Sequence, residues 1–298
     1  MSDGVEQVES VGEFPSRAPD AHKGDFGRVL VVGGSRGMIG APALAANAAL
    51  RGGAGLVTVA APEEVQLAVA VLCPCATSVP LVCDDDGHLT PEAVRQVRQA
   101  AEAADVLAVG PGLALGTVQR DIVRLVLQLA KPLVLDADGL NNLAGIEDWA
   151  AGRKCPAVLT PHPGEFARLT GAGVREIQSD RQQQAVAAVR RWADASFGQL
   201  PLVCLLKGRG TVVTDGRRAY VNDTGNPGMA TGGSGDVLTG LAAAIIAQGA
   251  EPFAAACLAA RIHGRAGDLA AEQGTQISTI ATDLLDFLPA AIEGHCCS

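Results

Sequence analysis

A run of glycines ends in a single carboxylate, Asp236, where a helical sequence begins. Residues 226–249 read NPGMATGGSGDVLTGLAAAIIAQG, with Gly232, Gly233 and Gly235 just before the helical part. Flexible residues at a helix N-terminus can point several N–H groups at one anion. A carboxylate beside such an anion hole can take the proton from a hydroxyl that attacks phosphorus. Peptide dipoles also favour carboxylates here, so the stretch alone leaves Asp236 as either a helix cap or a catalytic base.

Three more motifs place a special residue at the carboxyl end of a predicted strand. Gly112 follows DVLAVG, where a ligand could lie against bare backbone. His162 is fixed between two prolines in TPHPGEF, and Lys207 follows LVCLL, where its ammonium could neutralise phosphates. A tight turn, a surface histidine and an exposed hairpin lysine are the alternatives without a function. Ligands of parallel sheets bind at the carboxyl ends of the strands, so the shared position favours a common site.

The elements that would position these residues alternate along the chain. Strands are predicted at 28–34, 56–62, 105–112, 132–141, 157–160, 202–208, 211–216 and 218–223. Helices are predicted at 42–53, 63–72, 91–104, 117–130, 165–171 and 179–198, followed by two long alanine-rich helices and a segment at 281–292. Apolar strands that each lead into a helix indicate a parallel sheet covered on both faces, and the last three strands predict hairpins at one edge. The roles of Asp136 and Asp138, in the acidic end of the fourth predicted strand, stay open.

The domain organisation follows from where the pattern starts. Residues 1–22 are polar, contain Pro15 and Pro19, and are predicted to form a flexible N-terminal arm. No linker or change in composition divides residues 23–298, which are predicted to form a single domain.

Composition excludes several classes of protein. The 298 residues are 48% hydrophobic but only 3% aromatic, which predicts a core of aliphatic side chains and alanine. A formal net charge of −9 argues against nucleic acid or an anionic membrane as the main partner. The acidic start and the absence of a long apolar run predict a cytoplasmic protein. The eight cysteines show no paired CxxC motifs, so no zinc site is expected.

Two common nucleotide motifs are missing. VVGGSRGMIGAP lies between a strand and a helix but does not give G-x-G-x-x-G, and no acidic residue ends the next strand. The chain also has no G-x-x-x-x-G-K-[ST] sequence, which excludes a P-loop.

The complete set of motifs resembles the ADP-dependent NAD(P)H-hydrate dehydratases, from about Lys23 to near Pro289. In chain order the motifs are GRVLVVGGSRGMIGAPALAANAALRGGAGLVTVA, VGPGL, VLDADGLN, LTPHPGEFARL, LLKGRGTVV, NPGMATGGSGDVLTGLAAAIIAQG, HGRAGDLAAE and ATDLLDFLP. The resemblance implies an α/β fold, the ribokinase-like three-layer sandwich. Its central sheet is mainly parallel, with helices on both faces and hairpin strands added at an edge.

The resemblance also implies an activity, the repair of nicotinamide cofactors damaged by hydration. The S-form hydrate of NADH or NADPH (NADHX or NADPHX) is dehydrated to NAD(P)H while ADP is converted to AMP and phosphate. By resemblance, Asp236 is the base that activates the C6 hydroxyl for phosphorylation, after which phosphate is eliminated. Such an enzyme is a lyase.

Site residues carry over from the same family motifs. Ala41, Gly112 and His162 would contact the hydrated dinucleotide together with Asp236. The residues expected to bind ADP or AMP are Lys207, Gly208, Arg209, Gly210, Thr211, Asn226, Gly232, Gly233, Ser234 and Gly235. A Mg²⁺ ion would bridge the phosphates, with Glu165 in its water shell.

Partners and donor follow from the same resemblance. ADP is the expected co-substrate, with ATP possible. A separate NAD(P)HX epimerase is expected to interconvert the two hydrate forms, and the assembly is expected to be a homotetramer.

Two alternatives use the same motifs. A ribokinase-like kinase for a vitamin precursor would share the glycine cradle and the base, but would leave a stable phosphorylated product. A nucleotide-sensing module would use Asp236 only as a helix cap, and asparagine caps about as well as aspartate.

Overall fold

Ten strands form one sheet within residues 4–195 and 200–296, which the computed structural model describes. The sheet order is β1-β10-β9-β8-β7-β6-β5-β2-β3-β4. The strands are β1 Glu6–Gln7, β2 Arg28–Val32, β3 Leu56–Pro62, β4 Thr77–Leu81, β5 Val106–Val109, β6 Leu133–Leu135, β7 Ala157–Leu159, β8 Leu202–Leu206, β9 Val212–Thr214 and β10 Arg218–Val221. All neighbours run parallel except where β9 meets β8 and β10. The predicted parallel sheet with added hairpin strands is therefore confirmed.

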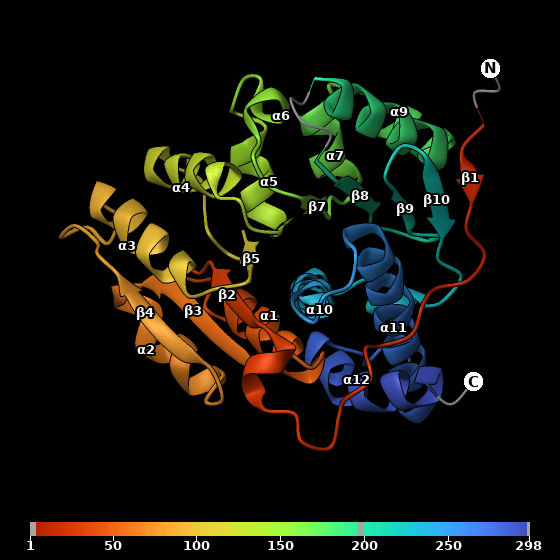
Figure 1. Cartoon of the computed structure of the whole chain (residues 1–298), viewed down its shortest axis with the longest axis horizontal. Helices are drawn as coiled ribbons and strands as arrows, with labels where there is room; N and C mark the ends of the chain where they lie inside the picture. The colour runs from red at the N-terminus through yellow and green to blue at the C-terminus, as the bar shows by residue number, and fades with distance from the viewer. Residues whose placement is uncertain (1–3, 196–199, 297–298) are drawn as a thin grey trace.

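Helices cover both faces of this sheet (Figure 1). One layer holds α1 Gly40–Arg51, α2 Glu63–Leu72, α10 Ser234–Ala247, α11 Pro252–Gln273 and α12 Ala281–Cys296. The other holds α3 Pro91–Glu102, α4 Thr117–Gln128, α5 Ala137–Leu143, α6 Trp149–Gly152, α7 Pro163–Thr170, α8 Val174–Ser179 and α9 Arg181–Asp194. Two 3-10 helices, η1 Lys23–Phe26 and η2 Pro227–Met229, lie in connections. The result is the predicted three-layer sandwich.

Two hydrophobic cores separate the layers, because successive strand residues point to opposite faces of a sheet. In β2, Val29 and Val31 pack into the core under α1 and α10. Leu30 and Val32 pack into the opposite core. Residues on both faces are buried, which explains why the sequence of this strand is continuously apolar.

The closest helix pair in the first layer is α1 against α10. A methyl group built on Gly240 of α10 would lie 1.9 Å from the carbonyl oxygen of Ala45 in α1. Ala45, Ala48 and Ala49 are fully buried. Small side chains on both helices let the backbones approach, and this contact fixes the helix that carries Asp236.

Several elements differ from the sequence prediction. β4 was not predicted, because its sequence TSVPL is half exposed, polar and contains a proline at the sheet edge. The predicted strand 132–141 ends at Leu135, and α5 begins at Ala137. The predicted helix 179–198 corresponds to α9, and its residues 196–198 lie outside the described part of the chain.

The N-terminal segment runs along the surface of the domain in Figure 1. β1 pairs with β10, Phe14 packs against the core, and Arg17 donates to the Gly53 carbonyl at 2.6 Å. The flexibility of residues 1–22 and the single domain at 23–298 stay predictions, and residues 1–3 and 297–298 lie outside the described ranges. No helix within those ranges is long and apolar enough to cross a bilayer.

Gly240→Ala is expected to destabilise the protein by at least about 2 kcal/mol, because its methyl group would collide with backbone rather than with a movable side chain. Urea unfolding followed by circular dichroism measures this. Gly294→Ala in α12 is the matched control, since a methyl group there meets nothing within 4 Å and alanine has the higher helix propensity. Equal stability of the two variants would contradict the close-packing argument.

Candidate active site

The N-terminus of α10 is built on a left-handed glycine. Gly233 is the N-cap residue, with φ +91°, and Asp236 is the third residue of the helix, so Asp236 is not at the cap position. A side chain on Gly233 would also meet Leu44 of α1 at 2.6 Å. Gly232 differs from Gly233, because a methyl group on Gly232 would meet nothing within 4 Å. The backbone is thus packed against α1 at Gly233 and faces open space at Gly232.

Two side-chain contacts hold this helix start in place. The Ser234 hydroxyl donates to the Met229 carbonyl at 2.9 Å. The Nε2 atom of His263, in α11, lies 2.8 Å from the Ser234 carbonyl and donates to it. Burial lowers the pKa of His263 to about 4, so its imidazole is neutral at physiological pH. His263 lies in the motif HGRAGDLAAE but had no predicted role.

Lys207 reaches from the end of β8 to this helix. Its Nζ lies 2.6 Å from Asp136 Oδ1 and 3.9 Å from Glu165 Oε2. A methyl group on Gly235 would lie 3.1 Å from the same Nζ. Burial acts to lower the pKa of Lys207, but the charges of Asp136 and Glu165 raise it above its ordinary value. The ammonium therefore stays charged beside the first turn of α10.

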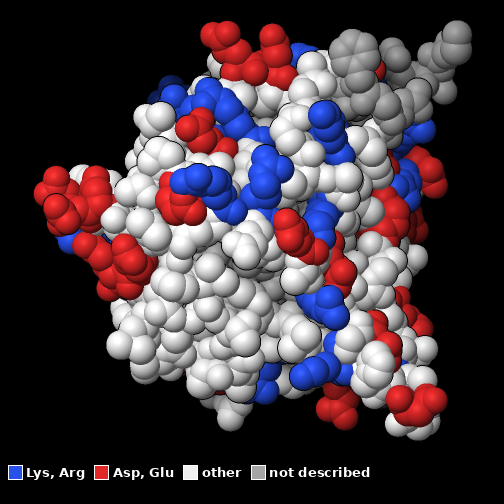
Figure 2. Space-filling model, turned by 60° about the vertical axis from the view of Figure 1, so that its left-hand side comes forward, with Lys and Arg blue, Asp and Glu red and all other residues white. Residues whose placement is uncertain are grey.

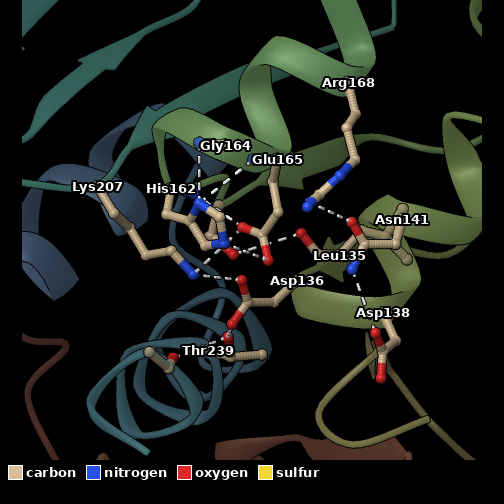
Figure 3. Close-up of polar contacts among 12 residues, drawn as sticks. Leu135, Asp136, Asp138, Asn141, His162, Gly164, Glu165, Arg168, Lys207 and Thr239 are labelled. Carbon is tan, nitrogen blue, oxygen red and sulfur yellow. Dashed lines mark hydrogen bonds and ion pairs between the residues drawn. The ribbon is translucent and has the colours of Figure 1, made fainter. Parts of the chain in front are cut away.

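Asp136 is the partner of Lys207 and lies at the end of β6. It is only 1% exposed. Its second oxygen accepts a hydrogen bond from the Thr239 hydroxyl at 2.7 Å. Figure 3 shows both contacts, with the His162–Glu165 pair above Asp136 and beside Lys207. The sequence placed Asp136 after a strand but gave no signal for its two partners.

Asp236 has the most perturbed carboxyl group of the site. Burial, followed by the negative charge of Asp136, raises its pKa to about 7, and Lys207 offsets only part of this effect. Asp138 and Glu165 raise the pKa further. A group with a pKa near 7 exchanges a proton readily at physiological pH, which suits a general base.

His162 and Glu165 cap α7 reciprocally. His162 Nδ1 accepts hydrogen bonds from the backbone N–H groups of Gly164 at 3.0 Å and Glu165 at 3.3 Å. In return, Glu165 Oε2 accepts the His162 N–H at 2.8 Å. Burial, then the positive charges of Lys207 and Arg168, lower the pKa of His162. Because Nδ1 accepts two N–H groups, the ring proton is on Nε2, which lies 3.3 Å from Glu165 Oε1, and half of the side chain is exposed.

Ala41 and Gly112 are neighbours in the described structure. Gly112 has φ +64°, and a methyl group on it would lie 3.3 Å from Ala41 Cβ and 2.7 Å from the Met38 carbonyl. Gly110, two residues earlier, has φ +126° and would collide with the Asp136 carbonyl if it carried a side chain. These glycines let the loop after β5 lie against the loops after β2 and β6.

The residues expected to bind the nucleotide lie in two segments. Residues 208–211 form the turn between β8 and β9, in which the Thr211 hydroxyl donates to the Gly208 carbonyl at 2.9 Å. Arg181, which had no predicted role, donates to the carbonyls of Leu206 and Lys207 and so supports this turn from α9. Arg209 is exposed on the same turn.

Asn226 begins the second segment and is held by α11. Its side chain donates to the Gly267 carbonyl at 2.8 Å and to Asp268 at 3.0 Å, and it accepts the Gly228 N–H. This anchors the segment that continues into Gly232–Gly235. Binding of dinucleotide or nucleotide by any of these residues stays a prediction.

The sequence profile of the NAD(P)H-hydrate dehydratases matches residues 29–290. The chain belongs to the NAD(P)H-hydrate dehydratase family. It is 46% identical over 280 residues to the bifunctional NAD(P)H-hydrate repair enzyme of Moorella thermoacetica, covering 93% of this chain and 51% of that protein. The corresponding Escherichia coli protein is 40% identical over 91% of this chain and 48% of its own length. The chain therefore spans about half the length of the curated relatives it matches.

Solved structures agree with this family. The ADP/ATP-dependent NAD(P)H-hydrate dehydratase from Bacillus subtilis, co-crystallised with ATP and Mg²⁺, is 32% identical, with 95% of each chain covered and a TM-score of 0.77. Hydroxyethylthiazole kinase from Pyrococcus horikoshii is 18% identical with a TM-score of 0.57. The second likeness shows the shared ribokinase-like fold alone.

Asp236→Asn is expected to stabilise this dehydratase-family protein at pH 8 but not near pH 4. The folded-state pKa of about 7 exceeds the ordinary value of 3.8, so the folded protein binds a proton that the unfolded chain releases. Stability therefore falls as the pH rises from about 4 through 7, and asparagine avoids this loss. We expect a gain of about 1–2 kcal/mol at pH 8, from about 1.4 kcal/mol per pKa unit reduced for solvent screening.

Urea unfolding at pH 4, 6 and 8 measures this effect. Asp286→Asn, which removes an exposed carboxylate from α12, controls for the change in net charge. A loss of stability in Asp236→Asn at pH 8 would show that its carboxylate is favourably paired rather than strained.

Proposed function

We propose that this chain dehydrates hydrated NADH and NADPH, using ADP as phosphoryl donor and releasing AMP and phosphate. Membership of the dehydratase family supports the substrate class. The observation that carries the mechanism is the Asp236 carboxyl, whose pKa is raised to about 7 one residue after Gly235, against which the Lys207 ammonium lies. Base, helix N-terminus and cation are the three elements that a hydroxyl attacking a phosphate requires.

The proposed reaction uses the residues of this chain in three roles. Asp236 accepts the proton of the substrate C6 hydroxyl. The hydroxyl oxygen bonds to the terminal phosphorus of ADP, while the bond between that phosphorus and the bridging oxygen breaks and AMP leaves. Lys207 and the N–H groups of Gly232–Gly235 stabilise the charge on the transferred phosphoryl group. The phosphate then leaves C6 with the C–O bond electrons, driven by the lone pair of the ring nitrogen. Loss of a proton from C5 to water forms the C5–C6 double bond and restores NAD(P)H.

Substrate and nucleotide would bind on either side of this centre. Ala41, Gly112 and the exposed half of His162 support a position for the hydrated dinucleotide over the loops after β2, β5 and β7. The turn 208–211 and the segment from Asn226 support a position for ADP. The Bacillus subtilis relative is named for both ADP and ATP, so ATP remains a second donor in the proposal.

A Mg²⁺ ion fits this site only if the bound nucleotide and water supply most of its ligands. No group of three or more His, Cys, Asp or Glu side chains among the described residues is arranged to hold a metal ion. Most ligands would therefore be phosphate oxygens and water, which Mg²⁺ commonly keeps. Glu165, 4% exposed with its pKa raised chiefly by burial, would hold one of those waters. When bound, the ion would neutralise charge on the phosphates.

The decisive assay incubates the protein with hydrated NADH and either ADP or ATP, and follows recovery of NADH absorbance and release of phosphate. Both signals should appear together. A stable phosphorylated product without NADH recovery would support the vitamin-precursor kinase instead. Failure with both donors would reject the dehydratase function.

Asp236→Asn should reduce turnover by about 10²–10⁴-fold, the usual contribution of a general base, and leave nucleotide affinity unchanged by calorimetry. The kcat/KM of the wild type should rise with pH through about 7, because the deprotonated carboxylate is the active form. Near-wild-type turnover in Asp236→Asn would leave Asp236 with only a helix-stabilising role, and would favour a nucleotide-sensing module.

We also propose self-association, through the outer face of α2. Leu67 is 73% exposed and Val71 is 71% exposed, one helical turn apart, with Leu72 beside them. Figure 2 shows a broad area without charged side chains on this side of the molecule, bordered by both acidic and basic groups. Apolar patches of this kind are typical of interfaces between subunits. A homotetramer and a functional link to an epimerase outside these 298 residues complete the proposal.

Leu67→Glu should shift the assembly toward smaller species, because two buried glutamates would face each other across a symmetric interface. Sedimentation velocity measures the change, with Leu115→Glu, at an exposed position in the loop after β5, as the control. The same assembly state in wild type and Leu67→Glu would exclude this face.

A further inference from the structure

A buried carboxylate that the proposed reaction does not use, Asp136, connects two parts of the site. One oxygen lies 2.6 Å from the Lys207 ammonium at the end of β8. The other accepts from the Thr239 hydroxyl, 2.7 Å away, in α10. Thr239 is fully buried, and Asp136 is 1% exposed. Both oxygens are thus engaged by elements 71 and 103 residues away in the sequence.

These two contacts fix the position of Lys207 relative to the helix start. Thr239 lies one turn after Gly235, whose carbonyl is 3.0 Å from the same hydroxyl. A methyl group on Gly235 would be 3.1 Å from Lys207 Nζ and 3.6 Å from Asp136 Oδ2. The lysine, the carboxylate and the helix backbone therefore meet at one point. A flexible lysine side chain would not keep this position without an anchor.

Asp136 also dominates the charge around Asp236. Besides burial, the groups that act on the Asp236 carboxyl are Asp136, Asp138 and Glu165, which raise its pKa, and Lys207, which lowers it. Asp136 has the largest effect of these four charges. Two histidines border the site. The pKa of His263 is lowered to about 4, and the Nδ1 atom of His162, whose pKa is also lowered, accepts two backbone N–H groups.

We propose that Asp136 is a positioning residue that holds the Lys207 ammonium against the first turn of α10, one residue before Asp236. It acts through its neighbours and does not itself touch the reacting atoms. The inference rests on the proposed function of Asp236 as general base. It assigns a role to Asp136, which lies between β6 and α5 and whose role the sequence left open.

Asp136→Asn separates this role from a merely structural one. The amide keeps the shape and can still accept from Thr239, but it removes the charge that anchors Lys207 and opposes ionisation of Asp236. Loss of the Asp136 charge lowers the pKa of Asp236, and release of the Lys207 ammonium toward Asp236 lowers it further. The acid limb of the kcat/KM profile should therefore move to lower pH by one unit or more, and kcat should fall at least tenfold because the base is weaker and the cation displaced.

Thr239→Val is the matched control. It removes the hydrogen bond to Asp136 but keeps both charges, with a side chain of nearly the same volume. Its kcat should fall less than that of Asp136→Asn, and the midpoint of its acid limb should stay with the wild type. A shift in Thr239→Val as large as in Asp136→Asn would show that packing, not charge, sets the Asp236 pKa, and would overturn the proposal.

A second readout does not depend on turnover. The ¹³Cγ signal of Asp236, assigned with Asp236→Asn, should titrate at lower pH in Asp136→Asn than in the wild type. An unchanged midpoint in both readouts would overturn the proposal, as would an unchanged midpoint with a raised Mg²⁺ requirement, which would make Asp136 a cation-holding residue. If the wild type shows no turnover but its Asp236 titration depends on Asp136, the proposed function fails while the electrostatic coupling stands.

Discussion

The contact between the Lys207 ammonium and the Asp136 carboxylate is the interaction on which the arrangement of this site depends. At 2.6 Å, and with Asp136 almost fully buried, it links β6 to β8 across the strand between them. Removing two charges from water is costly, and such a pair adds little net stability. Its value here is geometric, because it directs a flexible side chain to the start of α10. Thr239 completes the link by tying the helix to the same carboxylate.

The same region contains more negative charge than Lys207 can neutralise. Burial and neighbouring charge raise the pKa values of both Asp236 and Glu165, so these carboxyl groups bind protons more strongly than they would in water. This makes the site unfavourable for stability and suitable for proton transfer, a common feature of catalytic sites. A cation that arrives with phosphates would relieve the excess charge, which agrees with the expected magnesium–nucleotide complex.

Rigid surroundings make this local strain possible. The backbone of α10 is pressed against α1 at Gly240, held at its start by His263, and capped by a left-handed Gly233. Gly110 lets the loop after β5 lie against Asp136. These backbone contacts hold the loops at the carboxyl ends of the parallel strands close together, so the carboxylates of the site lie near one another.

Much of this could be predicted from the sequence where the signal is local. Continuous apolar strands predicted the parallel sheet, alanine-rich segments predicted the helices, and the tight turns after Lys207 predicted the hairpins. β4 was missed because a short, half-exposed edge strand that contains Pro80 has no such signal. The glycines before Asp236 were correctly placed at a helix start, but the cap residue proved to be Gly233, because the cap depends on backbone dihedral angles that composition does not specify.

The sequence by itself determined the order of the elements and the loops that carry Gly112, His162, Lys207 and Asp236, since periodicity and turn residues act over a few neighbours. Only the tertiary structure decided that Lys207 pairs with Asp136, that Thr239 and His263 support the helix start, and that the Asp236 carboxyl has a pKa near 7. Those properties come from burial and from contacts between residues tens of positions apart. They depend on the order of strands in the sheet, which brings distant loops together at one edge.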